Sequence, residues 1–259
     1  FRIEGSVAPG FESVKQLYEH KMRTLAENGT QLCVYYDGEK VVDLWASVTD
    51  EPGFSPDSLV NVFSSGKSLE AIALASLVDK GLLRYDDRIS QHWPEFAANG
   101  KGELTVAELM RHEAGLASFS RPLDPDDLLT ENIKQNKVGQ FIANQIQRFR
   151  KGETNRREYH AVTRGWIANE LFRRVDPQGR TMGEFLREDI SQPLAADAII
   201  GVKPEELARV KKVAPLGFWF QLRQSLTPKF LKRKMEHNIF QLLAKVIRLL
   251  PAVRNATVR

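Results

Sequence analysis

The stretch NVFSSGKSLEAIAL, residues 61–74, places a serine and a lysine one helical turn apart at the start of an apolar helix. Residues three apart on a helix lie on one face, so the side chains of Ser64 and Lys67 are expected to meet. A lysine amine can accept the proton of a serine hydroxyl when burial or a neighbouring cation lowers its pKa. The first helical turn also offers free N–H groups and partial positive charge, which stabilise an oxyanion. This spacing therefore suits acyl transfer, although Ser-Ser-Gly before a helix is also a common cap.

Further landmarks follow the serine and the lysine in order. The segment VFSSGKSLEAIALASLVDKGLLRYDDRISQHWPEF, residues 62–96, resembles the serine β-lactamase and penicillin-binding-protein superfamily. Residues 104–116, LTVAELMRHEAGL, look like the next landmark of that family, a Thr-led helix that ends in Leu-x-x-His-x-x-Gly-Leu. Residues 158–171, EYHAVTRGWIANEL, are similar to the tyrosine motif of class C β-lactamases and related esterases. The resemblance extends over residues 30–200 and is nearest to the esterase-like, class C-like branch.

The resemblance implies a role for three side chains. Ser64 would be the nucleophile, Lys67 would help to deprotonate it, and Tyr159 would act as base and then as acid to the leaving group. The backbone N–H of Ser64 would supply half of an oxyanion hole, and water would hydrolyse the acyl-enzyme. No metal and no organic cofactor are implied. The implied fold is α+β and β-lactamase/transpeptidase-like, with an antiparallel sheet flanked by helices plus a mainly helical subdomain.

The sequence departs from the family pattern in two ways. Position 161 is alanine, where the family often carries an asparagine that binds a substrate amide, so Ala161 favours ester over β-lactam or peptide hydrolysis. The third motif, Lys/His-x-Gly on a late strand, does not occur, and no glycine follows Gly217. The later strands of the expected sheet are missing as well. The sequence as given therefore reads as a family domain truncated on its C-terminal side.

The length fits one large domain or two small ones, and the resemblance implies a single β-lactamase-related domain, 1–259, with three parts. Residues 1–60 hold a helix and the first two sheet strands, 61–208 hold the helical part with the nucleophile helix, and 209–259 form a basic helical segment. A hairpin turn is expected at Asp37-Gly38, because this dipeptide suits a two-residue turn. The predicted helices are 11–25, 64–80, a stretch from Asp124 to Phe149, 160–175, 181–190 and 229–250.

Two histidines near these motifs are given structural roles. His112 is expected to stabilise a helix end or to bond a loop carbonyl, since it lies in the last turn of its helix. His160 follows Tyr159 directly, and adjacent side chains on a helix point apart, so it is not assigned to catalysis.

Composition and charge limit the other functions. With 42% hydrophobic and 27% charged residues the chain is an ordinary globular sequence, without an apolar run of membrane-spanning length or a recognisable signal peptide. Its one cysteine, Cys33, excludes an internal disulfide and a cysteine-based zinc site, and it slightly favours a cytoplasmic location. A targeting segment upstream of Phe1 stays open.

The net charge of +4 is unevenly distributed. From Arg209 onward there are 12 Lys/Arg and one acidic residue, Glu236. The competing hypothesis is therefore a catalytically inactive relative that binds a membrane or a protein through the basic amphipathic helix 229–250. Its apolar stripe could equally pack within its own domain. Nucleic acid is not expected as a partner, because no base-stacking aromatic pattern accompanies the charges. The expected partner at the active site is a small-molecule ester or a β-lactam-like substrate.

Overall fold

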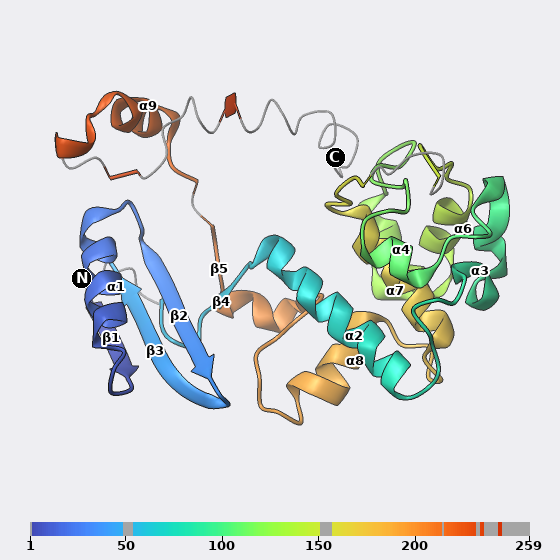
Figure 1. Ribbon diagram of the computed structural model, residues 1–259, viewed down its shortest axis with the longest axis horizontal. Coiled ribbons are helices and arrows are strands. Elements are labelled where there is room, and N and C mark those ends of the chain that lie inside the picture. The colour runs from blue at the N-terminus through green and yellow to red at the C-terminus, as the bar shows by residue number, and fades with distance from the viewer. Residues whose placement is uncertain are drawn as a thin grey trace. The chain divides into compact units, whose positions relative to one another are not determined.

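The computed structural model describes residues 2–48, 54–150, 157–213, 215–231, 234–235 and 243–244. The chain divides into two compact units, one of Phe1–Asn61 with Lys203–Arg248, the other of Val62–Val202 with Leu249–Arg259. Figure 1 labels their main helices and strands. The first unit contains β1 (Arg2–Val7), α1 (Glu12–Thr24), β2 (Gly29–Tyr36), β3 (Glu39–Ser47), β4 (Leu59–Val60), β5 (Val210–Lys211) and α9 (Phe218–Leu226).

The first unit is built on a three-stranded antiparallel sheet in the order β1-β3-β2. The predicted hairpin is confirmed, with Asp37 (φ 49°) and Gly38 (φ 79°) both in the left-handed region that a tight hairpin turn requires. Strand β1 was not predicted. It pairs with β3 from Arg2 opposite Ser47 to Val7 opposite Val42.

Helix α1 supplies the apolar cover of this sheet. Side chains of the helix, such as Val14 and Tyr18, pack against the buried Val42 and Leu44 of β3. The predicted helix over residues 11–25 is thus confirmed, and Leu17 on this helix is exposed. The two residues of β4 pair in parallel with those of β5.

The second unit is mainly helical. Its largest core packs α2 against α7 through buried apolar side chains, among them Leu74 and Leu77 on α2 and Ile167 and Leu171 on α7. The helices of this unit are α2 (Lys67–Asp79), α3 (Ile89–His92), α4 (Val106–Met110), α5 (Thr130–Lys134), α6 (Lys137–Ala143), α7 (Thr163–Val175) and α8 (Met182–Phe185), with a π-helical turn over Leu186–Ser191.

Several predicted boundaries of this unit are confirmed. Gly81 ends α2 in the left-handed region (φ 69°), and the N–H of Leu82 donates to the carbonyl of Leu77 over 2.9 Å. Thr105 caps α4 in a reciprocal arrangement with Glu108.

The long helical stretch predicted from Asp124 to Phe149 is wrong. It forms a short 3-10 turn, α5 and α6, and the break comes at Asn136, whose φ of 65° cannot continue a right-handed helix. The apolar side chains of α2 do not all face the core. Ala73, Leu74 and Leu77 are buried, while Ile72 is exposed.

One lysine of the second unit is fully buried. The ammonium of Lys101 donates to three backbone carbonyls over 2.6–2.7 Å, those of Ala98, Ala143 and Gln145. These bonds fasten the segment before α4 to the end of α6, so this lysine serves the packing of the fold.

Most of the predicted basic helix 229–250 lies outside the described residues. The described residues 229–231 of this range form a 3-10 turn. Among the described helices, none is long and apolar enough to cross a lipid bilayer. The described residues also hold no group of three or more His, Cys, Asp or Glu side chains that could bind a metal ion.

Candidate active site

Ser64 lies just before α2. It belongs to a 3-10 turn, Phe63–Gly66, and Lys67 is the first residue of the α-helix that follows. Ser64 is exposed, and the residue before it, Phe63, has a φ of 48°. A bulky side chain rarely adopts this backbone conformation, and strained residues of this kind cluster at functional sites. The serine is therefore presented at a tight bend that leads into the helix.

Lys67 contacts both other predicted site residues. Its Nζ is 3.5 Å from the hydroxyl oxygen of Ser64, at the outer limit of a hydrogen bond. The same nitrogen lies 5.2 Å from the ring centre of Tyr159. Its shortest contact is to the backbone carbonyl of Ala161, to which it donates over 2.6 Å. The side-chain nitrogen of Lys67 thus lies near the side chains of both Ser64 and Tyr159.

Tyr159 is packed on one side and open on another. Its ring lies 4.9 Å from the ring of His112, with 50° between the planes, and the residue is 48% exposed. An aromatic pair at this separation contributes beyond its buried area, so His112 helps to hold the tyrosine ring in place.

Two histidines fasten the tyrosine segment to the loop after α4. The N–H of His160 donates to Nδ1 of His112 over 3.0 Å, and the N–H of Glu158 donates to the carbonyl of His112 over 3.1 Å. In the other direction, the N–H of Leu116 donates to Nε2 of the fully buried His160 over 3.0 Å. Tyr159 is therefore flanked on both sides by anchored residues.

These contacts fix the protonation of His160. Because Nε2 accepts from a backbone N–H, the ring proton is on Nδ1, which donates to the carbonyl of Glu158 over 2.6 Å. Burial lowers the pKa of His160 below its usual value, which keeps the ring neutral.

His112 is held neutral as well. Donors face both of its nitrogens, namely the N–H of His160 at Nδ1 and the guanidinium of Arg164, 3.3 Å from Nε2. Burial, followed by the positive charge of Arg164, lowers the pKa of His112 to about 4. The predicted bond from His112 to a loop carbonyl is wrong, since its Nδ1 accepts a bond from the backbone of the tyrosine segment.

Arg164 of α7 connects the site to its surroundings. Its guanidinium pairs with Glu70 of α2 at 3.0 Å, with both side chains largely buried. It also donates to the carbonyl of Met110 and to the carbonyl of Lys67, each over 3.2 Å. One side chain thus links α2, α4 and α7 directly behind Lys67.

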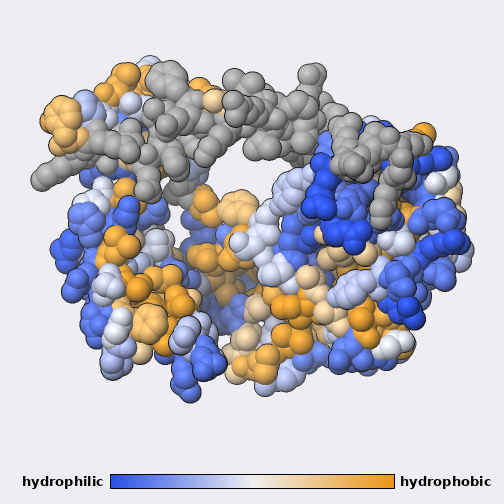
Figure 2. Space-filling model, in the orientation of Figure 1, coloured by the Kyte–Doolittle hydropathy of each residue, from blue (hydrophilic) through white to orange (hydrophobic). Residues whose placement is uncertain are grey.

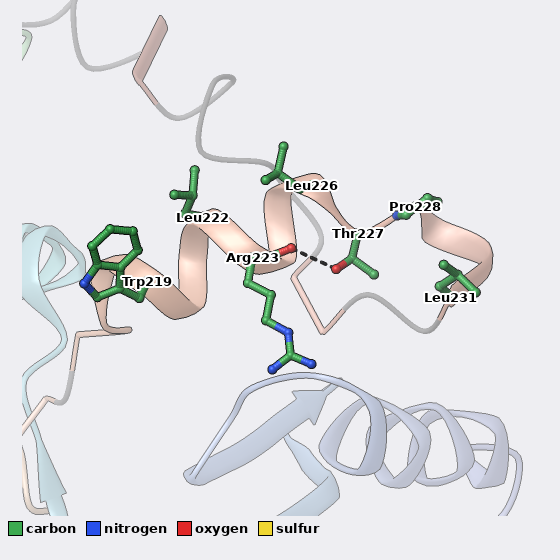
Figure 3. Close-up of a pocket in the computed structure, with 7 residues that line it drawn as sticks. All are labelled: Trp219, Leu222, Arg223, Leu226, Thr227, Pro228 and Leu231. Carbon is green, nitrogen blue, oxygen red and sulfur yellow. Dashed lines mark hydrogen bonds between the residues drawn. The ribbon is translucent and has the colours of Figure 1, made fainter.

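A separate apolar hollow lies at α9 in the other unit. The depression is open, and most of its lining is apolar, with Arg223 and Thr227 as the polar residues. The side chains of Trp219, Leu222 and Leu226 project from the helix (Figure 3). The hydroxyl of Thr227 donates to the carbonyl of Arg223 over 2.8 Å and closes the last helical turn.

Comparison with known proteins identifies the family. The family model described as Beta-lactamase matches residues 14–225. The chain belongs to the Beta-lactamase family. Among curated members, it is 33% identical over 201 residues to the esterase/beta-lactamase LipL of Mycobacterium tuberculosis, which covers 76% of this chain and 44% of LipL.

Solved structures of family members agree with the α+β fold. A penicillin-binding protein homologue from Caulobacter crescentus has a TM-score of 0.74 and 36% identity, and the match covers 83% of this chain and 57% of that protein. A family VIII carboxylesterase has a TM-score of 0.73 and 32% identity, with coverage of 83% and 58%. EstA from Arthrobacter nitroguajacolicus Rue61a has a TM-score of 0.70 at 29% identity. The chain spans about half the length of these similar proteins.

The sequence analysis missed Arg164 and Glu70. A signal for them was available, because a charged residue one turn after Lys67 interrupts an otherwise apolar helix, and a buried charge needs a partner. The partner itself could not be chosen from the sequence, since several arginines lie in and near α7.

Proposed function

We propose that this chain is a serine hydrolase that cleaves carboxylic esters through an acyl-enzyme on Ser64. The observation that carries the proposal is the position of the Lys67 nitrogen, 3.5 Å from the hydroxyl of Ser64 and beside the ring of Tyr159. A hydroxyl within reach of a basic group is the arrangement that activates a serine nucleophile.

The proposed reaction has two steps. The hydroxyl oxygen of Ser64 attacks the ester carbonyl carbon while its proton passes to the neutral amine of Lys67 or to the phenolate of Tyr159. The carbon–oxygen bond to the alcohol then breaks, and the same group returns the proton to the leaving oxygen. Water, deprotonated in the same way, hydrolyses the acyl-enzyme and frees the serine. The backbone N–H of Ser64 is the proposed oxyanion donor, and each step uses only side chains, backbone and water.

The ester preference rests on Ala161 and on the relatives. An alanine side chain cannot form a hydrogen bond with a substrate amide, and the Lys67 contact at this position uses only the backbone carbonyl. LipL is named an esterase/beta-lactamase, and a similar solved structure is a family VIII carboxylesterase. A β-lactam is the second substrate class that we propose.

Intact-protein mass spectrometry tests this proposal. The chain is incubated with p-nitrophenyl acetate and, separately, with benzylpenicillin. We expect one acetyl group to be added by the ester, and no acetyl group in Ser64→Ala. The matched control is Ser65→Ala, which removes an equally exposed hydroxyl from the same turn.

A second variant tests the acid–base group. Tyr159→Phe keeps the ring that packs on His112 and removes only the hydroxyl, so acylation should slow by about 10²–10⁴-fold without loss of stability. Equal acylation in Ser64→Ala and the wild-type chain would refute the assignment of the nucleophile. Failure of both reagents to form an adduct would favour the inactive relative that binds a partner.

A further inference from the structure

Helix α9 and the turn after it expose an unusual amount of apolar surface. None of the nine residues of α9 is buried, although they include two phenylalanines and a tryptophan. Trp219 is 77% exposed and Phe230 is 82% exposed. Contiguous apolar patches of this kind on soluble proteins mark interaction sites. The exposed apolar residues of this face, which we name the α9 face, are Val213, Leu216, Phe218, Trp219, Leu226, Phe230 and Leu231.

The α9 face is hollowed rather than flat. Trp219, Leu226 and Leu231 line the open depression beside the helix (Figure 3). In the space-filling view, hydrophobic residues gather at the upper left, over α9 (Figure 2). The rings of Phe218 and Trp219 contact each other edge to face with their centres 5.4 Å apart, and the open depression beside them leaves room for flexible hydrocarbon chains.

The charged residues of the segment that carries the α9 face all have the same sign. Residues 209–235 include eight Lys/Arg and no Asp or Glu. Among the described cations, Arg223 is exposed on the wall of the depression, and Lys212 and Lys234 are exposed near it in the sequence. An apolar groove on a partner protein would gain little from these positive charges. A lipid surface offers both hydrocarbon and phosphate, so it can contact the apolar residues and the cations together.

We propose that the α9 face binds the surface of an anionic lipid bilayer. Trp219 and Phe230 enter the interfacial region, where amphipathic and aromatic rings are favoured, and the cations contact the lipid phosphates. The contact is peripheral, because among the described residues no helix is long enough to cross a bilayer. Membrane contact is thus assigned to α9 and the turn after it, which overlaps only the start of the predicted helix 229–250.

Trp219 provides a built-in reporter. Of the four tryptophans, Trp45 and Trp93 are buried, Trp166 is partly buried, and Trp219 is exposed. Vesicles of phosphatidylcholine alone and of phosphatidylcholine mixed with phosphatidylglycerol are added to the 259-residue chain. We expect a blue shift of emission and co-sedimentation with the mixed vesicles only, weakening as salt is added. Trp219→Phe should abolish the shift and retain most of the binding.

Substitutions separate the two parts of the contact. Phe230→Ser should weaken binding to mixed vesicles, and Arg223→Glu should weaken it by about tenfold or more, since each cation at an anionic surface is worth roughly fivefold. The matched controls are Ile146→Ser, an exposed apolar residue of the other unit, and Arg84→Glu, an exposed cation there; both should bind as the wild-type chain does. All these positions are exposed, so the variants should fold.

Three results would overturn the proposal. They are equal binding to neutral and mixed vesicles, loss of binding in the controls as large as in the α9 variants, and self-association of the chain through the α9 face without vesicle binding. Vesicle binding should be unchanged in Ser64→Ala. Failure of the hydrolase proposal and failure of this one are therefore separate outcomes.

Discussion

Replacing Arg164 by methionine should destabilise the protein more than any loss of a surface ion pair. The guanidinium is 8% exposed, and its partner carboxylate on Glu70 is 16% exposed, 3.0 Å away. Methionine keeps the length and the apolar packing of the stem but leaves that carboxylate buried without a cation. Breaking a buried pair from one side costs about 3–5 kcal/mol, because the remaining charge is uncompensated.

Two further losses add to this estimate. The carbonyls of Met110 and Lys67 each lose a charged donor, at about 1 kcal/mol each where no water replaces it. We therefore expect Arg164→Met to lower the free energy of unfolding by about 5–7 kcal/mol, or by about 3–5 kcal/mol where water replaces both lost donors. The stability of Arg164→Lys should lie between those of the wild-type chain and Arg164→Met, since an ammonium can pair with Glu70 but cannot reach all the acceptors of a guanidinium.

Urea unfolding followed by circular dichroism measures the effect. The matched control is Arg84→Met, because Arg84 pairs with Asp86 at 2.8 Å while both side chains are 73% exposed. A pair of this kind contributes little to stability, because both charges remain hydrated. If Arg164→Met lost no more stability than Arg84→Met, the guanidinium would not be holding α2 and α7 together, and our interpretation would be wrong.

A double variant isolates the charge pair. Glu70→Leu combined with Arg164→Met removes the buried carboxylate together with its cation, so the double variant should be more stable than the sum of the two single losses predicts. It should remain less stable than the wild-type chain, because the two carbonyls still lack their donor. Strict additivity would show that the pair is not coupled.

Two other predictions concern the second unit. Lys101→Met leaves three buried carbonyls without their donor, so the unfolding free energy should fall by about 2–4 kcal/mol in a thermal melt, with no change in vesicle binding. His112 has a folded pKa of about 4 against 6.5 for the free side chain, so the unfolded chain binds more protons between these values. The stability that this residue contributes is complete above pH 6.5 and is lost as the pH falls towards 4, and it is smaller than the full shift would give because the ring is only partly buried. His112→Asn, which tolerates the left-handed backbone there (φ 64°), should flatten the pH dependence of urea unfolding, and an unchanged slope would contradict the shift.

Local turn and cap chemistry could be predicted because it depends on neighbouring residues. Asp37-Gly38 indicates a tight hairpin turn, Thr105 a helix start, and Gly81 a helix end, and each lies where expected. Strand β1 escaped prediction for the opposite reason. Its sequence, RIEGSV, has a glycine in the middle and exposed polar residues, and it becomes a strand only by pairing with β3.

The candidate site divides in the same way. The meeting of Ser64 and Lys67 follows from helical spacing, and Tyr159 was placed by resemblance to a motif. The pairing of Arg164 with Glu70 depends on how α7 lies on α2, and the mutual anchoring of His112 and His160 depends on two loops coming together. Such contacts are long-range, and no pattern within either segment specifies them.

The groups that fix Lys67 are mostly backbone atoms, and this has a consequence for the site. The side-chain nitrogen of Lys67 donates to the carbonyl of residue 161, and the carbonyl of Lys67 itself accepts from Arg164. Neither bond depends on which side chain occupies position 161. A change from asparagine to alanine there can therefore alter the contacts offered to a substrate without moving the lysine. In the proposed mechanism, the choice of substrate would then depend on the exchangeable side chain at position 161, and the activation of Ser64 would depend on the main chain that holds Lys67.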